Sequence, residues 1–238
     1  AFLSANADDQ IVIRHTGRTA STSTVRSGET YLTAGNSIVA DADSHLNASG
    51  VLEVRAGTEI NLGVVTVDNE NLFYADDGDL VIGNFAGSAA IVGSGKNVAI
   101  TSLGGITIGN LQAYDGNVTV RSADIDLSSG SIEAYSPSSP SSTLVNNDSG
   151  QTTYVGGFGP RTGYHIDGEE LYALRADAVT IETAAATGST APLMVVDSFE
   201  LSTGDANMDL TLRSAGDMEV VGTAILRGEY SNNTLSVD

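Results

Sequence analysis

The amino-acid sequence predicts an all-β solenoid, a parallel β-helix with about 20 residues per coil. Three observations indicate this fold class. Hydrophobic residues make up 41% of the 238 residues but aromatic residues only 5%, so the apolar side chains are mostly aliphatic and suit a thin, uniform core. The 27 glycines, with many Ser, Thr, Asn and Asp, supply turns at short intervals. The third observation is a strand-turn-strand phrase that recurs along the chain.

The repeated phrase reads apolar, any residue, apolar, then often Arg, a short turn, and the same alternation again. Its five copies begin at Leu52, Val98, Val118, Tyr172 and Leu210. Because successive side chains of a strand point to opposite sides, the alternation predicts short strands with one buried face. The two neighbouring copies, counted from Asn97 and Asn117, start 20 residues apart, and each contains about three such strands. Three strands and three turns form one coil of a solenoid.

Coils stacked in parallel lie about 4.8 Å apart, so the chain length predicts about a dozen coils in a rod of about 55 Å. The whole chain, 1–238, is expected to form this single domain. An antiparallel sandwich is the alternative, and Asp77-Gly78, Asp115-Gly116 and Asp167-Gly168 fit its hairpin turns. The short strands and the regular period favour the solenoid.

One region, from Ser136 to Glu170, breaks the repeat. It is rich in Ser, Asn and Gly and contains three of the four prolines, Pro137, Pro140 and Pro160. Proline cannot donate a hydrogen bond to a strand ladder, so the segment is predicted to be an irregular loop excursion from the coils. Loops on a rigid scaffold often carry specificity, which makes the loop Ser136 to Glu170 the favoured binding region.

The charge balance restricts the possible partners. Ten basic and thirty acidic residues give a net charge of −20, which repels phosphate backbones and anionic lipid headgroups and argues against nucleic acid and membrane-surface binding. No stretch approaches the roughly 20 consecutive apolar residues of a membrane span. The absence of cysteine excludes disulfides and thiolate chemistry and is compatible with an exported protein.

Three runs join Gly to Asp, Asn or Gly and then to alternating apolar residues: Gly78-Asp79-Leu80-Val81-Ile82-Gly83-Asn84, Gly104-Gly105-Ile106-Thr107-Ile108-Gly109-Asn110-Leu111 and Gly116-Asn117-Val118-Thr119-Val120. The chain resembles the filamentous haemagglutinin family of large exoproteins in these runs. The resemblance implies a right-handed parallel β-helix, export across an outer membrane, and a role as adhesin, toxin stalk or surface fibre. The family's amino-terminal secretion signature of the Asn-Pro-Asn-Gly type is missing, so the segment is expected to be an internal part of the shaft.

Catalytic residues of β-helical polysaccharide hydrolases and lyases are not evident in the sequence. Such enzymes need clustered acids beside a base for proton transfer at the sugar. His15, His45 and His165 lie in unrelated contexts and are expected on the surface. The arginines that follow the repeated strands are two to three coils apart, so each is expected to pair with a local acid rather than to form a basic stripe.

Calcium is the one cofactor that the sequence suggests. Asp76, Asp77 and Asp79 surround a turn glycine and supply the hard oxygen ligands that Ca²⁺ prefers. Asp41 and Asp43 form a similar pair. Neither group matches a known calcium-loop pattern, and acids at turns are also expected simply because turns are solvated.

The leading prediction is a non-catalytic structural and adhesive shaft, secreted or on a bacterial cell surface. Its expected partners are neighbouring coils or subunits of the same fibre, and host or cell-surface glycans or proteins. No amphipathic helix caps either end of the sequence, which predicts that the chain continues or that subunits stack end to end. A polysaccharide-binding or polysaccharide-degrading β-helix and a phage tail-fibre or spike segment are the alternatives.

Overall fold

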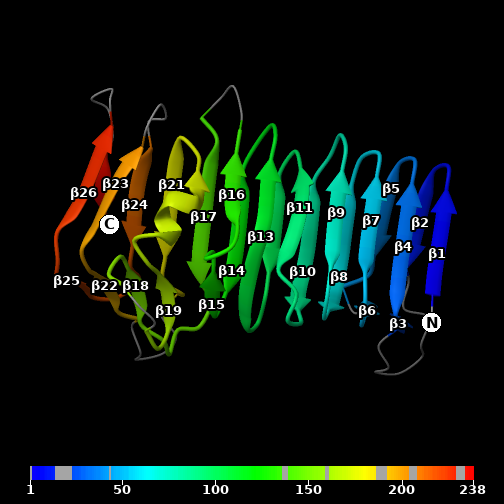
Figure 1. Cartoon of the computed structure of the whole chain (residues 1–238), viewed down its shortest axis with the longest axis horizontal. Helices are drawn as coiled ribbons and strands as arrows, with labels where there is room; N and C mark the ends of the chain where they lie inside the picture. The colour runs from blue at the N-terminus through cyan, green and yellow to red at the C-terminus, as the bar shows by residue number, and fades with distance from the viewer. Residues whose placement is uncertain are drawn as a thin grey trace.

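The computed structural model describes residues 2–13, 23–42, 44–135, 139–158, 161–185, 192–203, 208–228 and 234–238. These residues contain 27 strands and one short 3-10 helix, η1 (Glu170–Ala173). Figure 1 shows the strands stacked side by side along the long axis, with β1 at one end and β26 at the other. The predicted parallel β-helix is confirmed.

Two long sheets form two faces of the solenoid. Sheet 1 contains, in spatial order, β1 (Phe2–Ala7), β4 (Glu29–Ala34), β7 (Leu52–Ala56), β9 (Asn71–Ala75), β11 (Ile91–Gly95), β13 (Gly105–Ala113), β16 (Ser131–Ala134) and β20 (Leu174–Arg175). Sheet 2 contains β2 (Gln10–Ile13), β5 (Ser37–Ala40), β8 (Ile60–Val67), β10 (Leu80–Ala86), β12 (Val98–Thr101), β14 (Val118–Ser122), β17 (Ser141–Asn146), β21 (Ala178–Glu182), β24 (Asp209–Arg213) and β27 (Leu235–Val237). All these sheet 2 strands pair in parallel.

A third face closes each coil. It contains β3 (Ser23–Ser27), β6 (Ser44–Ala48), the second halves of β8 and β10, the start of β13, β15 (Asp124–Asp126), β19 (Tyr164–Ile166), β18 (Thr153–Val155), β22 (Met194–Val196) and β25 (Met218–Val220). The last pair, β23 (Phe199–Thr203) and β26 (Ala224–Gly228), forms a separate two-stranded sheet. Strands β14, β15 and β16 of one coil are the three strands predicted from the phrase that starts at Val118.

The coil length is regular only in the middle of the chain. Ile60, Leu80, Val98 and Val118 are successive register partners, so these coils have the predicted length of about 20 residues. Ser142, the partner of Val118, pairs in turn with Val179, and the coils there are much longer. Sheet 2 therefore runs through ten strands. The prediction of about a dozen coils was too high because residues leave the coils as connections.

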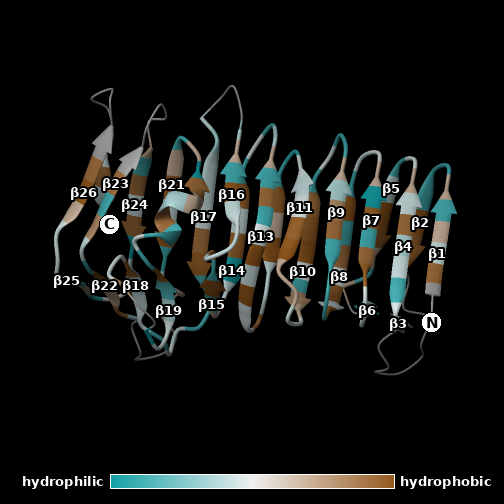
Figure 2. Cartoon of the chain, in the orientation of Figure 1, coloured by the Kyte–Doolittle hydropathy of each residue, from teal (hydrophilic) through white to brown (hydrophobic). Residues whose placement is uncertain are grey.

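The interior is a continuous column of aliphatic side chains. Inward residues such as Leu52, Ile108 and Val120 are fully buried, and their outward neighbours are polar. Figure 2 shows this alternation as brown and teal bands along the strands. Burying one such side chain completely contributes about 1.5–3 kcal/mol, so the regular alternation is the main source of stability.

A ladder of polar side chains explains the Gly-Asp and Gly-Asn motifs. Each ladder residue stands just before a strand of sheet 2 and accepts a hydrogen bond from the backbone of the next coil. Asp79 Oδ1 accepts from Asn97 N (3.2 Å) and Nδ2 (3.0 Å). Asn97 Oδ1 accepts from Asn117 N (2.9 Å), and Asn117 Oδ1 accepts from Ser141 N (2.9 Å). The motif thus fixes the register from coil to coil.

The segment 136–170 lengthens one coil, but it is not irregular throughout as predicted, because parts of it form strands of the solenoid. Strand β17 lies within sheet 2 between β14 and β21, and β18 and β19 pair in parallel on the third face. The first inward residue of β17 is Ser142, which is polar but fully buried. The apolar alternation that identifies the other strands is therefore missing at the start of β17. Residues 136–138 and 159–160 lie outside the described residues.

The third face contains one strand more than the other two faces at this point. Its order is β15, β19, β18 and β22, while β16 lies next to β20 in sheet 1 and β17 next to β21 in sheet 2. One extra strand lengthens a face by about 4.8 Å. Figure 1 accordingly shows β23 and β26 inclined relative to the strands before β16. The solenoid bends where the repeat is interrupted.

Candidate functional site

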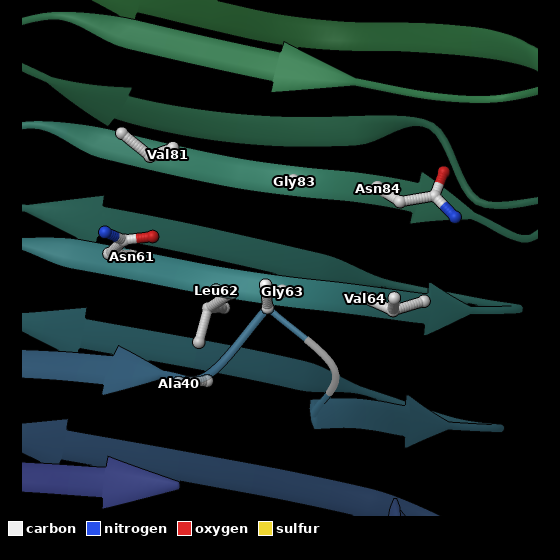
Figure 3. A pocket seen from close by; sticks show the side chains of 9 residues that line it. Ala40, Asn61, Leu62, Gly63, Val64, Val81, Gly83 and Asn84 are labelled. Atoms are coloured by element: carbon white, nitrogen blue, oxygen red, sulfur yellow. The ribbon is translucent and has the colours of Figure 1, made fainter. Parts of the chain in front are cut away.

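A groove lies at the corner where sheet 2 meets the third face, over β8 and β10 (Figure 3). One wall carries Asn61 and Val81 from sheet 2, and the other carries Val64 and Asn84 from the third face. Gly63 and Gly83 form the floor between the walls, and Ala40 and Ala42 close one end. The volume of this corner groove is about 400 Å³.

The groove exists because β8 and β10 turn this corner without leaving the ladder. In the preceding coil the corner is a separate turn between β5 and β6, and in the following coil it is a turn between β12 and β13. A Cβ atom on Gly63 would lie 2.6 Å from the carbonyl oxygens of Asp41 and Ala42, so only glycine permits the close approach of these coils. Leu103, in the following turn, is 77% exposed and stands beside the groove, because its N–H donates to Asn84 Oδ1 (3.1 Å).

The region favoured by the sequence for binding forms a packed cluster on the third face. Arg161 pairs with Asp197, and its guanidinium carbon lies 5.0 Å from the centroid of the Tyr154 ring. His165 packs edge-on against Tyr154, and its Nε2 lies 3.1 Å from the carbonyl oxygen of Gly156. These contacts link the connection after β18 to the solenoid.

The histidine predictions have different outcomes. His165 is 9% exposed, so its expected surface position was wrong. The reason is that β19 inserts between β15 and β18, where the connection after β18 covers the third face. His45 is half-buried on β6, and His15 lies outside the described residues.

Glu170 is the carboxylate most strongly embedded in this region. Its two oxygens accept from Leu127 N (2.7 Å) and from Asp167 N (2.9 Å). Burial raises the pKa of Glu170, although the two backbone donors act in the opposite direction. Asp167 in turn accepts from the N–H groups of Glu169 and Glu170 (2.8 Å each) at the start of η1. The pair therefore ties η1 to β15 and β19, which is a structural role.

The calcium candidates do not converge. Asp77 pairs with Lys96 (2.9 Å), and Asp79 belongs to the polar ladder. Within the ranges that the structure describes, no three His, Asp or Glu side chains lie close enough together to hold a metal ion. Asp76 is therefore in no such group. Asp41 is described and Asp43 is not.

Three of the four arginines after the repeated strands pair with acids. The pairs are Arg55 with Glu53 (2.5 Å), Arg175 with Glu133 (3.0 Å) and Arg213 with Glu182 (2.5 Å). Arg175 and Arg213 reach acids on the preceding coil, which the sequence alone does not reveal. Arg55 and Arg175 stand on sheet 1, whereas Arg121 and Arg213 stand on sheet 2, so the four do not form one stripe.

The repeated phrase in the sequence does not predict the corner groove. Its only sequence signal is a Gly inside each of two long apolar runs, Gly63 and Gly83, where other coils have a turn. Comparison of the chain with protein-family models, with curated protein sequences and with solved structures finds no significant match. In the described ranges, no helix has the length and apolar character needed to cross a membrane.

Proposed function

We propose that this chain is a non-catalytic structural and adhesive shaft segment of a bacterial cell-surface or extracellular filament protein. The observation that carries the proposal is the unbroken register of sheet 2 through ten strands. Each inner coil is held by hydrogen bonds to two neighbours and by a shared aliphatic core, so local loss of structure is opposed from both sides. Such a lattice suits a protein whose task is to hold a shape.

Charge and end surfaces are compatible with this role. The net charge of −20 keeps the sides of neighbouring shafts apart. At the β25 to β27 end, Val220, Leu235 and Val237 are 61%, 37% and 56% exposed, whereas their register partners one coil earlier are buried. A further coil of the same geometry, within the same filament, is the partner that fits this surface.

Two experiments test the proposal. Incubation with neutral and acidic polysaccharides, with and without Ca²⁺, is expected to release no reducing or unsaturated ends, and release of either would overturn the non-catalytic assignment.

Sedimentation velocity and negative-stain electron microscopy over a concentration series are expected to show end-to-end particles of constant width. The double variant Val220→Lys and Val237→Lys is expected to shorten them, and a wild-type monomer at every concentration would contradict the stacking.

A further inference from the structure

The corner groove is an uncharged recess on a strongly acidic protein. The chain has a net charge of −20, yet none of the described residues that line the groove is charged. An anionic ligand would find no cation there and would be repelled by the rest of the surface. A metal cation would find no carboxylate in the lining. The lining itself offers amides and aliphatic side chains and no charged partner, and such a lining suits a neutral ligand.

The walls combine two amides with two aliphatic side chains. The two amides lie on opposite walls and on different strands. Val81 is the register partner of Asn61, and Asn84 is the register partner of Val64, so each wall carries one Asn and one Val. The Asn61 amide makes no hydrogen bond to the described part of the chain. The Asn84 amide uses its oxygen for Leu103 N, which leaves its Nδ2 group available to a ligand. Figure 3 shows the two amides on opposite sides of the glycine floor.

This combination matches the surface of a sugar ring. A pyranose carries vicinal hydroxyls at its rim, which pair with the adjacent donor and acceptor of an amide. Its faces carry C–H groups, which pack against aliphatic side chains such as Val64 and Val81. Small-molecule sites have volumes of roughly 300–1,000 Å³ and are mainly apolar with a few polar groups. The corner groove has a volume of about 400 Å³, and its lining joins two amides to aliphatic side chains, so it agrees with both properties.

We propose that the corner groove binds one or two neutral sugar residues of a glycan. The proposal deepens the adhesive part of the proposed function and rests on it. The two amides bind hydroxyls from opposite walls, and the valines contact the ring face. Because a Cβ on Gly63 would lie 2.6 Å from carbonyl oxygens of the preceding coil, this part of the floor is closely packed, and the site is formed before the ligand arrives.

The test uses the whole chain and defined tetrasaccharides. Cellotetraose, maltotetraose, mannotetraose, galactotetraose and N-acetylchitotetraose are titrated in ¹H–¹⁵N NMR experiments, with tetragalacturonate as the acidic counterpart. At least one neutral tetramer is expected to bind with a Kd of about 0.1–1 mM, with shifts concentrated on β8 and β10. Asn61→Ala is expected to weaken binding by about fivefold to tenfold through loss of the amide's hydrogen bonds to the sugar, which exchange with water in the free state. Ala42→Trp fills the end of the groove from an exposed position and is expected to weaken it more than tenfold.

A matched control separates the groove from general surface effects. Ser129→Trp places the same side chain at an exposed position on another corner and is expected to leave the Kd unchanged. The proposal is overturned if no neutral tetramer shifts the β8 and β10 signals at 10 mM, if Ala42→Trp binds like wild type, or if tetragalacturonate binds more tightly. These readouts are independent of filament formation, so the shaft can be confirmed while the groove assignment fails, or the reverse.

Discussion

Asn97 stands at the centre of the polar ladder and offers a sharp test of what sets the register. Its Nδ2 donates to Asp79 Oδ1 (3.0 Å), and its Oδ1 accepts from Asn117 N (2.9 Å). Asn97→Ala removes both bonds, but water can reach the exposed partners. One bond involves a carboxylate and the other a backbone amide, so the free energy of unfolding is expected to fall by about 1–3 kcal/mol. For a chain of this size that corresponds to a fall in Tm of roughly 2–12 °C.

Asn97→Asp distinguishes hydrogen bonding from charge. The new carboxylate can still accept from Asn117 N, but it faces Asp79 Oδ1 at about 3 Å, where repulsion between two exposed carboxylates costs about 1–3 kcal/mol. Its destabilisation at pH 7.5 is therefore expected to shrink in high salt and at pH 3, whereas that of Asn97→Ala should depend little on salt.

Urea denaturation followed by far-UV circular dichroism measures both variants, with Ser129→Ala as an exposed control. If the free energy of unfolding of Asn97→Ala lies within about 0.5 kcal/mol of wild type, the range of ordinary surface substitutions, the polar ladder does not stabilise the register. A salt dependence of Asn97→Asp no larger than that of Asn97→Ala would refute the charge argument separately.

Three further predictions concern the core, a coil contact and a buried carboxylate. Ile108→Ala leaves a cavity in the fully buried column and is expected to lower the free energy of unfolding by about 2–5 kcal/mol, measured in urea; a loss below 1 kcal/mol would mean that the core is loosely packed. Gly57→Ala puts a Cβ 2.1 Å from the Gly35 carbonyl oxygen, so its Tm is expected to fall clearly, and a Tm equal to wild type would show that the coils separate easily. The raised pKa of Glu170 means that the folded chain binds its proton more tightly than the unfolded chain does, so this group adds stability as the pH falls through its folded-state pKa towards the ordinary value of 4.5. The free energy of unfolding of wild type minus that of Glu170→Gln is thus expected to increase as the pH falls in a series of urea unfolding curves, and a decrease would contradict the sign of the shift.

Much of the fold could be predicted because one coil is short enough to be seen in the sequence. In the copy of the phrase that starts at Val118, the alternation predicts three strands with inward apolar residues. The apolar residues Val118, Val120, Ile125 and Ile132 are buried in β14, β15 and β16. The period of about 20 residues holds wherever no residues are added between strands. The alternation works as a signal because the core needs an apolar residue at every second position.

The prediction failed where polar residues point inward. Ser142 and Asn146 face the interior from β17, and Tyr164 and His165 of β19 are buried. Such positions are satisfied or covered by parts of the chain that return from elsewhere: Asn146 Nδ2, for example, donates to Thr153 Oγ1 at 3.0 Å. Composition cannot distinguish such strands from solvated loops, so 136–170 was assigned as one excursion.

The sequence by itself determined the strand period, the aliphatic interior and the acidic surface, because each depends on local alternation and composition. Only the tertiary structure decided how the coils lie on one another. Three features depend on the register between residues far apart in the chain. They are the pairing of Arg175 with Glu133, the extra strand β19 on the third face, and the corner groove over Gly63 and Gly83. That register is set by the whole stack, and for this reason the groove became visible only when β8 and β10 were seen side by side.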